Sequence, residues 1–154
     1  MTPVNEEEAA VYDAVERWAE KEVRPIAKRF DHADEYPTEL VEQMKELGLF
    51  GATIAQKYGG LGLSCVTSAR IVMKISSVWV APVGIFNSHL IMAAAVQRNG
   101  TEAQKRQWLP RFATGELRGG IGLTEPNAGT DLQSIRTVAK RAADGTQYTI
   151  NGTK

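Results

Sequence analysis

The residues best suited to chemistry lie in one stretch, residues 121–131. An apolar run that could form a buried strand changes there to a turn containing Pro, Asn and Gly. Thr124 and Thr130 bring hydroxyls, which donate and accept hydrogen bonds, to the two sides of this turn. Gly129 has no side chain to keep a ligand away from the main chain. Such a loop can offer N–H groups to a polar, partly anionic ligand, although a solvated turn after a strand explains the same residues.

The two histidines and the single cysteine offer little further chemistry. His89 lies in an apolar segment, but no His, Cys or carboxylate at helical spacing could orient it or share a metal with it. We expect a structural histidine, or one that lines a pocket wall, and we expect His32 to be a surface or capping residue. Cys65 should be a buried, inert thiol, since it has no partner for a disulfide or a zinc site. No metal site is predicted.

The charge balance excludes several classes of partner. Among 154 residues, Lys plus Arg and Asp plus Glu each number 18, so no net charge attracts nucleic acid or an anionic membrane surface. The acidic run Glu6 to Glu8 is unlike a signal peptide, and a lone cysteine suits a reducing compartment. We therefore expect a cytoplasmic protein.

Apolar residues recur at helical spacing over the first two thirds of the chain. A long first helix should follow a capping box formed by Asn5 and Glu8, and Pro25 should kink it. Its apolar stripe comprises Val11, Val15, Trp18, Ala19, Val23, Ile26, Ala27 and Phe30. A second helix should open at Pro37 and end at Gly48. The glycine-rich residues 58–62 predict a tight turn, because no Lys-Ser or Lys-Thr pair follows them to make a phosphate-binding P-loop.

Three more helices are predicted. The third begins at Ser64, and the fourth is the apolar segment 78–96, whose length approaches that of a membrane span. Its Pro82 and the polar residues 87–89 favour a buried helix of a soluble protein. The fifth should start with a capping box at Thr101, direct Leu109 and Phe112 inward, and bend or end at Pro110.

The final residues change from a helical to an extended period. Glycines at positions 115, 119 and 120 mark the boundary, so we predict a helical domain over residues 1–115 and the beginning of a β-domain over 116–154. The expected strands are 121–124, 137–141 and 147–150, with Asp144-Gly145 as the hairpin turn between the last two. The fold class is therefore mainly α with a short β part at the C-terminal end.

The order of these motifs resembles the acyl-CoA dehydrogenase family, which has an N-terminal helical domain, a middle β-domain and a C-terminal four-helix domain. The matching stretches are residues 35–37, 46–49, 58–62, 100–102 with 104–105, 109–110, 123–126 with 129–131, and 151–154. They span the whole chain in the family's order, which is more specific than any one motif.

The resemblance implies a reaction and its cofactor, FAD. An acyl-CoA thioester loses an α-proton to a carboxylate and a β-hydride to the flavin, which gives a 2-enoyl-CoA. The implied flavin-binding residues are Ile121, Gly122, Leu123, Thr124, Gly129 and Thr130. Thr130 also matches a hydroxyl residue between the flavin pyrophosphate and acyl-CoA, and residues 83–94, with Asn87 and His89, are expected to line the acyl pocket. An electron-transferring flavoprotein is the implied electron acceptor, and a homo-oligomer, dimer or tetramer, is the implied assembly.

Two departures limit what the resemblance implies. Asn127 replaces a frequent Gly, so we expect it to tolerate an unusual backbone angle. The family's catalytic Glu has no matching position here, so no residue of this chain, including Glu125, is assigned as the base, and the chain alone should be inactive.

Two alternatives remain open. The same scaffold serves flavin monooxygenases, nitroalkane oxidases and acyl-CoA oxidases, which the residues present here do not distinguish. The chain could also be a non-catalytic helical module that binds acyl-CoA.

Overall fold

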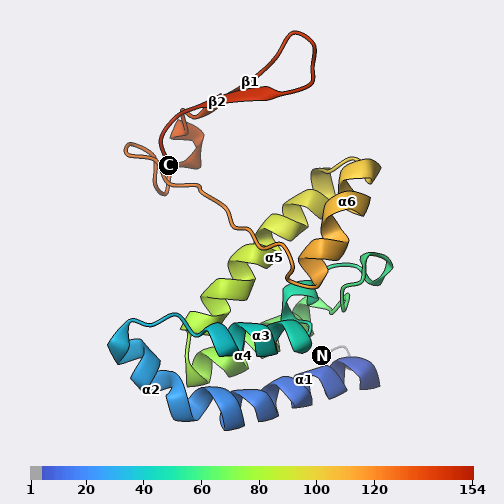
Figure 1. The fold of residues 1–154 in the computed structure, drawn as a ribbon, viewed down its shortest axis with the longest axis vertical. Coiled ribbons are helices and arrows are strands. Elements are labelled where there is room, and N and C mark those ends of the chain that lie inside the picture. Colours follow the sequence, from blue (N-terminus) through green and yellow to red (C-terminus); the bar gives the residue numbers. More distant parts are fainter. Residues whose placement is uncertain (1–4) are drawn as a thin grey trace. The chain divides into compact units, whose positions relative to one another are not determined.

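The computed structural model describes residues 5–154 and divides into two compact units, the first ending at Gly120 and the second comprising Ile121–Lys154 (Figure 1). Each unit is described by itself. The first contains α1 (Glu6–Trp18), the π-helical turn η1 (Ala19–Val23), α2 (Arg24–Ala33), α3 (Thr38–Glu46), the 3-10 turns η2 (Leu49–Gly51) and η3 (Gln56–Tyr58), α4 (Cys65–Val78), α5 (Ala81–Asn99) and α6 (Glu102–Ala113). The second contains the 3-10 turn η4 (Leu132–Ser134), β1 (Val138–Arg141) and β2 (Tyr148–Asn151). The mainly helical fold class is confirmed, whereas the domain limit at residue 115 stays a prediction.

The first predicted helix is present and is interrupted as its proline suggested. The π-helical turn η1 ends at Val23, two residues before Pro25, whose missing N–H and ring disturb the regular hydrogen-bond ladder. Asn5 caps α1 by accepting the Glu8 N–H at 2.7 Å. The Glu8 side chain does not complete the expected capping box, because its carboxylate accepts hydrogen bonds from Ser64 and Thr67 at the start of α4. The two helix N-termini are therefore tied together.

The glycine turns behave as predicted. Gly48 follows α3 with a left-handed φ of 70°. At Gly60 the main chain passes so close to a neighbour that an added Cβ would lie 2.1 Å from the Ile54 carbonyl oxygen. Only glycine fits this approach.

The boundary between α4 and α5 differs from the prediction. Ser64 caps α4 as expected, but α4 extends to Val78, and α5 begins at Ala81 rather than at residue 78. Pro82 in the first turn of α5 is the true start signal. Cys65, the first residue of α4, is exposed, so the expected buried thiol is wrong. No helix among residues 5–154 combines the length and apolar character that a membrane span requires.

The capping box of α6 is confirmed, since the Thr101 hydroxyl accepts the Gln104 N–H and the Gln104 side chain accepts the Thr101 N–H. Pro110 does not end the helix, which continues to Ala113. Leu109 and Phe112 are buried as expected, and Trp108 stacks on Phe112 at a centroid distance of 6.4 Å.

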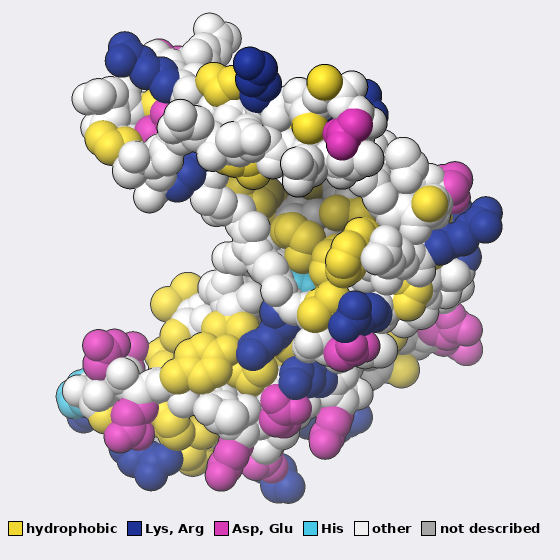
Figure 2. All heavy atoms as spheres, turned by 45° about the horizontal axis from the view of Figure 1, so that its top comes forward, with side chains coloured by type: hydrophobic (Ala, Val, Ile, Leu, Met, Phe, Trp, Pro, Cys, Tyr) yellow, Lys and Arg dark blue, Asp and Glu magenta, His cyan; other side chains and the backbone are white. Residues whose placement is uncertain are grey.

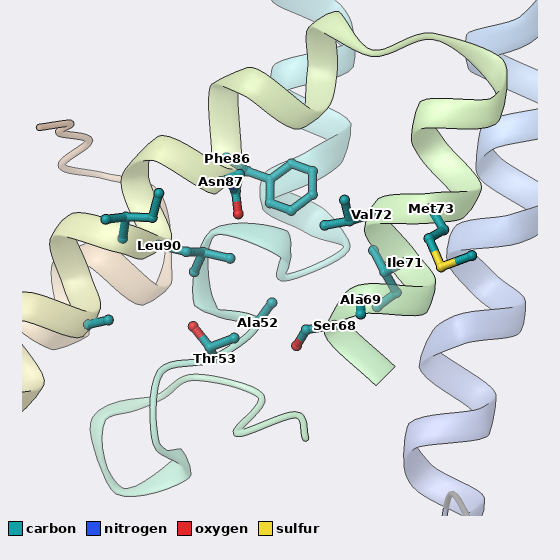
Figure 3. Close-up of a pocket in the computed structure, with 12 residues that line it drawn as sticks. Ala52, Thr53, Ser68, Ala69, Ile71, Val72, Met73, Phe86, Asn87 and Leu90 are labelled. Atoms are coloured by element: carbon teal, nitrogen blue, oxygen red, sulfur yellow. The ribbon is translucent and has the colours of Figure 1, made fainter. Parts of the chain in front are cut away.

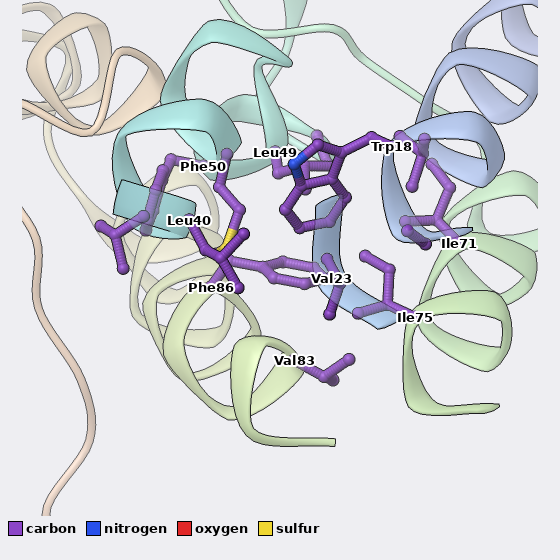
Figure 4. Close-up of a cluster of buried hydrophobic side chains, with 14 of the residues drawn as sticks. Trp18, Val23, Leu40, Leu49, Phe50, Ile71, Ile75, Val83 and Phe86 are labelled. Carbon is purple, nitrogen blue, oxygen red and sulfur yellow. The ribbon is translucent and has the colours of Figure 1, made fainter. Parts of the chain in front are cut away.

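The main core of the helical unit is formed by apolar side chains from α1, η1, α2, α3, η2, α4 and α5, including Trp18, Val23, Leu40, Phe50, Ile71 and Phe86 (Figure 4). The Trp18 indole donates to the Gln43 side chain at 2.6 Å, which satisfies its N–H inside an apolar setting. A second cluster, with Ile54, Ala93 and Leu109, packs α6 against α5. On the face shown in Figure 2, acidic and basic side chains alternate without one large patch of either sign.

The second unit contains the predicted hairpin. β1 and β2 pair antiparallel, with Val138 opposite Asn151 and Arg141 opposite Tyr148, and Asp144 and Gly145 lie in the connecting turn. Residues 121–124 do not form the expected buried strand. Ile121 and Leu123 are exposed, because no strand within residues 5–154 pairs with this run.

Candidate functional site

In the helical unit, a cavity of about 430 Å³ lies between α4 and α5 (Figure 3). We call it the α4–α5 cavity. Its lining is mostly apolar and consists of Ala52, Thr53, Ser68, Ala69, Ile71, Val72, Met73, Phe86, Asn87, Leu90, Ile91 and Ala94. A cavity of this size and polarity is typical of sites for small organic ligands.

The walls of the cavity are held by the fold. Ile71 and Phe86 are each 1% exposed and belong to the main core as well as to the cavity lining. Gln97 of α5 holds the segment after η2 in place. Its side chain donates to the Thr53 carbonyl at 3.3 Å and accepts the Ala55 N–H at 3.0 Å. The cavity is therefore formed by positioned side chains and not by a loose gap between helices.

Three residues bring polar side chains to this apolar lining: Thr53, Ser68 and Asn87. Asn87 was predicted from the sequence to line an acyl pocket, and it lies in the cavity wall. Thr53 and Ser68 were not predicted. Ser68 lies one turn after the helix cap Ser64, and this spacing gave no sign that the residue would line a cavity.

His89 is not in the lining but is fully buried in the helical unit. Its Nε2 lies 3.0 Å from the Phe112 carbonyl oxygen, and its Nδ1 accepts the Gly119 N–H at 3.4 Å. Both ring nitrogens therefore have main-chain partners, as in a neutral imidazole with its proton on Nε2. Burial lowers the pKa of the ring below its usual value, with the carbonyl partners opposing this shift. These contacts favour a structural role for His89, and its expected place in an acyl pocket stays a prediction.

In the second unit, residues 121–131 form a loop with a tight turn at residues 125–128. The residues on either side of this turn, 121–124 and 129–131, are exposed. Glu125 and Ala128 exchange main-chain hydrogen bonds at 2.9 and 3.1 Å, and this pairing closes the turn over Pro126 and Asn127. The predicted flavin-binding residues Ile121, Gly122, Leu123, Thr124, Gly129 and Thr130 are all exposed. A side chain added at Gly129 would meet no heavy atom within 4 Å, so the main chain there is open to a ligand.

Glu125 anchors this loop to the hairpin. Its carboxylate accepts the Arg136 N–H at 2.7 Å and the Thr137 N–H at 2.9 Å. Lys154 approaches the same carboxylate at 3.0 Å and donates to the Leu123 carbonyl at 3.1 Å. The Thr137 side chain and the Arg136 N–H lower the pKa of the Glu125 carboxyl to about 2. A carboxylate whose pKa is this low is a weak general base near neutral pH.

Two further expectations concern this loop and metals. Asn127 does not have the unusual backbone angle that we expected, since Asp34 is the non-glycine residue with positive φ among residues 5–154. Pro126 and the Glu125–Ala128 pairing already close the turn with ordinary angles. Within the same residues, no group of three or more His, Cys, Asp or Glu side chains could hold a metal ion.

Comparison with known proteins gives a consistent set of relatives. Residues 5–116 match the family described as acyl-CoA dehydrogenase, N-terminal domain. A short-chain-specific acyl-CoA dehydrogenase of Clostridium acetobutylicum is 38% identical over 149 residues, which cover 96% of this chain and 39% of that protein. The structure of butyryl-CoA dehydrogenase from Megasphaera elsdenii has a TM-score of 0.87 and 30% identity, over 99% of this chain and 40% of that one.

A solved structure described as an electron transferring flavoprotein of Acidaminococcus fermentans has a TM-score of 0.88 and 30% identity. This comparison covers 99% of the present chain and 40% of the other. The chain thus spans about two fifths of the length of these relatives.

Proposed function

The chain belongs to the acyl-CoA dehydrogenase family, and on this premise we propose that it supplies the acyl-binding helices and one flavin-contacting loop of an FAD-dependent acyl-CoA dehydrogenase. The reaction converts an acyl-CoA thioester to a 2-enoyl-CoA by loss of an α-proton and a β-hydride. Bound FAD would accept that hydride.

The α4–α5 cavity is the observation that carries this proposal. Its side chains are mostly apolar, and its volume of about 430 Å³ lies in the range of small-molecule sites. Each methylene group of an acyl chain that enters it contributes about 0.8 kcal/mol through removal from water. In this role Ile71 and Phe86 hold the acyl group in a fixed orientation and exclude water from it.

The loop of residues 121–131 fits the flavin. Ile121 and Leu123 offer exposed apolar side chains to a flat ring system, and Thr124 and Thr130 offer exposed hydroxyls to its polar edge and to phosphate. The open main chain at Gly129 leaves room for close approach. In this proposal Glu125 and Lys154 position the loop and do not react.

No catalytic base is assigned to the described residues. The α4–α5 cavity has no Asp or Glu among the lining residues that the structure describes, and Glu125 has a strongly lowered pKa. We therefore expect the purified 154-residue chain to lack dehydrogenase activity. Turnover of an acyl-CoA by this chain would contradict the assignment.

A non-catalytic acyl-CoA-binding module is the second candidate. It is favoured by one observation, namely that every described residue of the cavity lining belongs to the helical unit. Separate titrations with FAD and with hexanoyl-CoA distinguish the two, because a module binds the acyl-CoA and not the flavin. If flavin binds, reoxidation by oxygen or by an electron-transferring flavoprotein separates an oxidase or monooxygenase from a dehydrogenase.

The proposed partners follow from the family. They are an acyl-CoA substrate, an electron-transferring flavoprotein as electron acceptor, and further copies of the subunit in a homo-oligomer. A cytoplasmic location is proposed because a lone cysteine suits a reducing compartment.

The acyl-binding proposal is tested by filling the cavity. Ala69, an exposed residue of its lining, is replaced by Trp, and hexanoyl-CoA binding is measured by isothermal titration calorimetry against free CoA. We expect Ala69→Trp to lose at least about tenfold in the affinity gained from the hexanoyl group. The control Ala10→Trp, at an exposed site of α1, should bind as the unmodified chain does. Equal binding by Ala69→Trp would refute the proposed acyl site.

A further inference from the structure

One polar atom in the wall of the α4–α5 cavity has no partner. The Ser68 hydroxyl oxygen is buried and makes no hydrogen bond. A buried hydroxyl in this condition carries a desolvation cost that a bound polar group would remove. Buried polar groups are nearly always hydrogen-bonded in folded proteins, so an exception inside a ligand cavity points to a ligand.

Two other serines on the same two helices bond their hydroxyls to the main chain of their own helix. Ser77 on α4 donates to the Lys74 carbonyl at 2.7 Å, and Ser88 on α5 donates to the Gly84 carbonyl at 2.8 Å. Ser68 is also helical, with its own N–H bonded to the Ser64 carbonyl at 3.0 Å, but its hydroxyl does not turn back to the helix. Ser68 is one of the residues that line the cavity (Figure 3).

Two more polar side chains face the same space. Thr53 comes from the segment after η2 and Asn87 from α5, and both line the cavity together with Ser68 (Figure 3). The described lining contains no Lys, Arg or His. A carboxylate would therefore lose its hydration without gaining a counter-charge, whereas a neutral hydroxyl would find both donors and acceptors.

We propose that the α4–α5 cavity selects acyl groups that carry a neutral hydrogen-bonding substituent, such as a hydroxyl, and that Ser68 is the residue that recognises it. This inference rests on the proposed acyl-CoA function and narrows its substrate class. Ser68 is a specificity-determining residue here and takes no part in proton or hydride transfer.

The test compares probes that differ only in the acyl chain. Hexanoyl-CoA, its analogues with one hydroxyl on carbon 4, 5 or 6, and adipoyl-CoA, which ends in a carboxylate, are titrated into the 154-residue chain by calorimetry. Ser68→Ala should lower the affinity for at least one hydroxylated probe about threefold to tenfold and change that for hexanoyl-CoA less than about twofold. Adipoyl-CoA should bind the unmodified chain most weakly. The control Ser77→Ala, outside the cavity, should change neither affinity.

Folding of the variant is checked by its thermal melting temperature. This should equal or exceed that of the unmodified chain, because Ala is the better helix former and the unpartnered hydroxyl is gone. Unchanged affinity for all three hydroxylated probes in Ser68→Ala, or an equal loss for hexanoyl-CoA, would overturn the role of Ser68 and leave the acyl site intact. Failure of hexanoyl-CoA itself to bind more tightly than CoA would overturn the proposed function as well.

Discussion

At the scale of single residues, two ionisable side chains near the candidate sites are held by main-chain hydrogen bonds. His89 has main-chain partners on both ring nitrogens, and Glu125 accepts two main-chain N–H groups. Ser68, which carries no sequence signal, instead lines the cavity and has a buried hydroxyl without a hydrogen-bond partner. Residue type alone does not show which polar side chains have hydrogen-bond partners. That depends on which main-chain atoms the fold places beside each side chain.

The structural role of His89 predicts a large stability effect. His89→Ala removes two hydrogen bonds and the edge-on contacts of the ring with Phe50 and Phe112. We expect a loss of about 2 to 4 kcal/mol in the free energy of unfolding, measured with urea. His32→Ala, at an exposed site, should stay within about 0.5 kcal/mol of the unmodified chain. Similar losses in both variants would contradict the structural assignment.

The Glu125 anchor predicts a defined pH dependence. The pKa of its carboxyl is lowered from 4.5 to about 2, so the unfolded state takes up the proton first as the pH falls. The anchor should contribute fully above pH 4.5 and be lost as the pH falls from there toward 2. Protection of the Arg136 and Thr137 amides from hydrogen exchange reports this loss.

The variant Glu125→Gln removes the negative charge of this side chain and keeps its size. At pH 7, Glu125→Gln should lower the protection of both amides about tenfold, because bonds to a charged acceptor are replaced by weaker ones. The control Asp13→Asn changes an exposed carboxylate of α1 and should leave protection unaltered. Unchanged protection in Glu125→Gln would show that the carboxylate does not hold the loop.

At the scale of secondary-structure elements, the sequence was most informative where polar residues cap a helix. Ser64 and Thr101 were predicted as helix starts, and both accept the expected N–H groups. The break between α4 and α5 was misplaced because Trp79 and Val80 are as apolar as the helices beside them. The strand predicted at 121–124 was wrong because an apolar run indicates burial without saying which strand would pair with it.

Two glycines of the helical unit predict opposite effects of one substitution. Gly60→Ala places a Cβ 2.1 Å from the Ile54 carbonyl oxygen, so the turn must open and the melting temperature should fall by several degrees. Gly84→Ala, on the exposed face of α5 with no heavy atom within 4 Å, should raise stability by up to about 1 kcal/mol through helix propensity. Thermal unfolding followed by circular dichroism measures both, and a stabilising Gly60→Ala would mean that the approach to Ile54 is not as close as described.

At the scale of the whole molecule, the change from helical to extended periodicity was enough to predict a helical unit followed by a hairpin. The cavity could not be predicted in the same way. Its lining comes from residues 52–53, 68–73 and 86–94, and the space arises from how α4 and α5 pack against the core and not from any local pattern. Of the polar residues in its wall, Asn87 was expected from the sequence, whereas Thr53 and Ser68 were not.

The most direct test of the account is a map of hexanoyl-CoA binding on the isotope-labelled chain by two-dimensional nitrogen–proton NMR, with free CoA as the reference. We predict that the amide shifts specific to the hexanoyl group concentrate in residues 68–73 of α4 and 86–94 of α5, which line the cavity. Shifts confined to other surfaces, or no shifts beyond those that CoA causes, would contradict the assignment of the α4–α5 cavity as the acyl site.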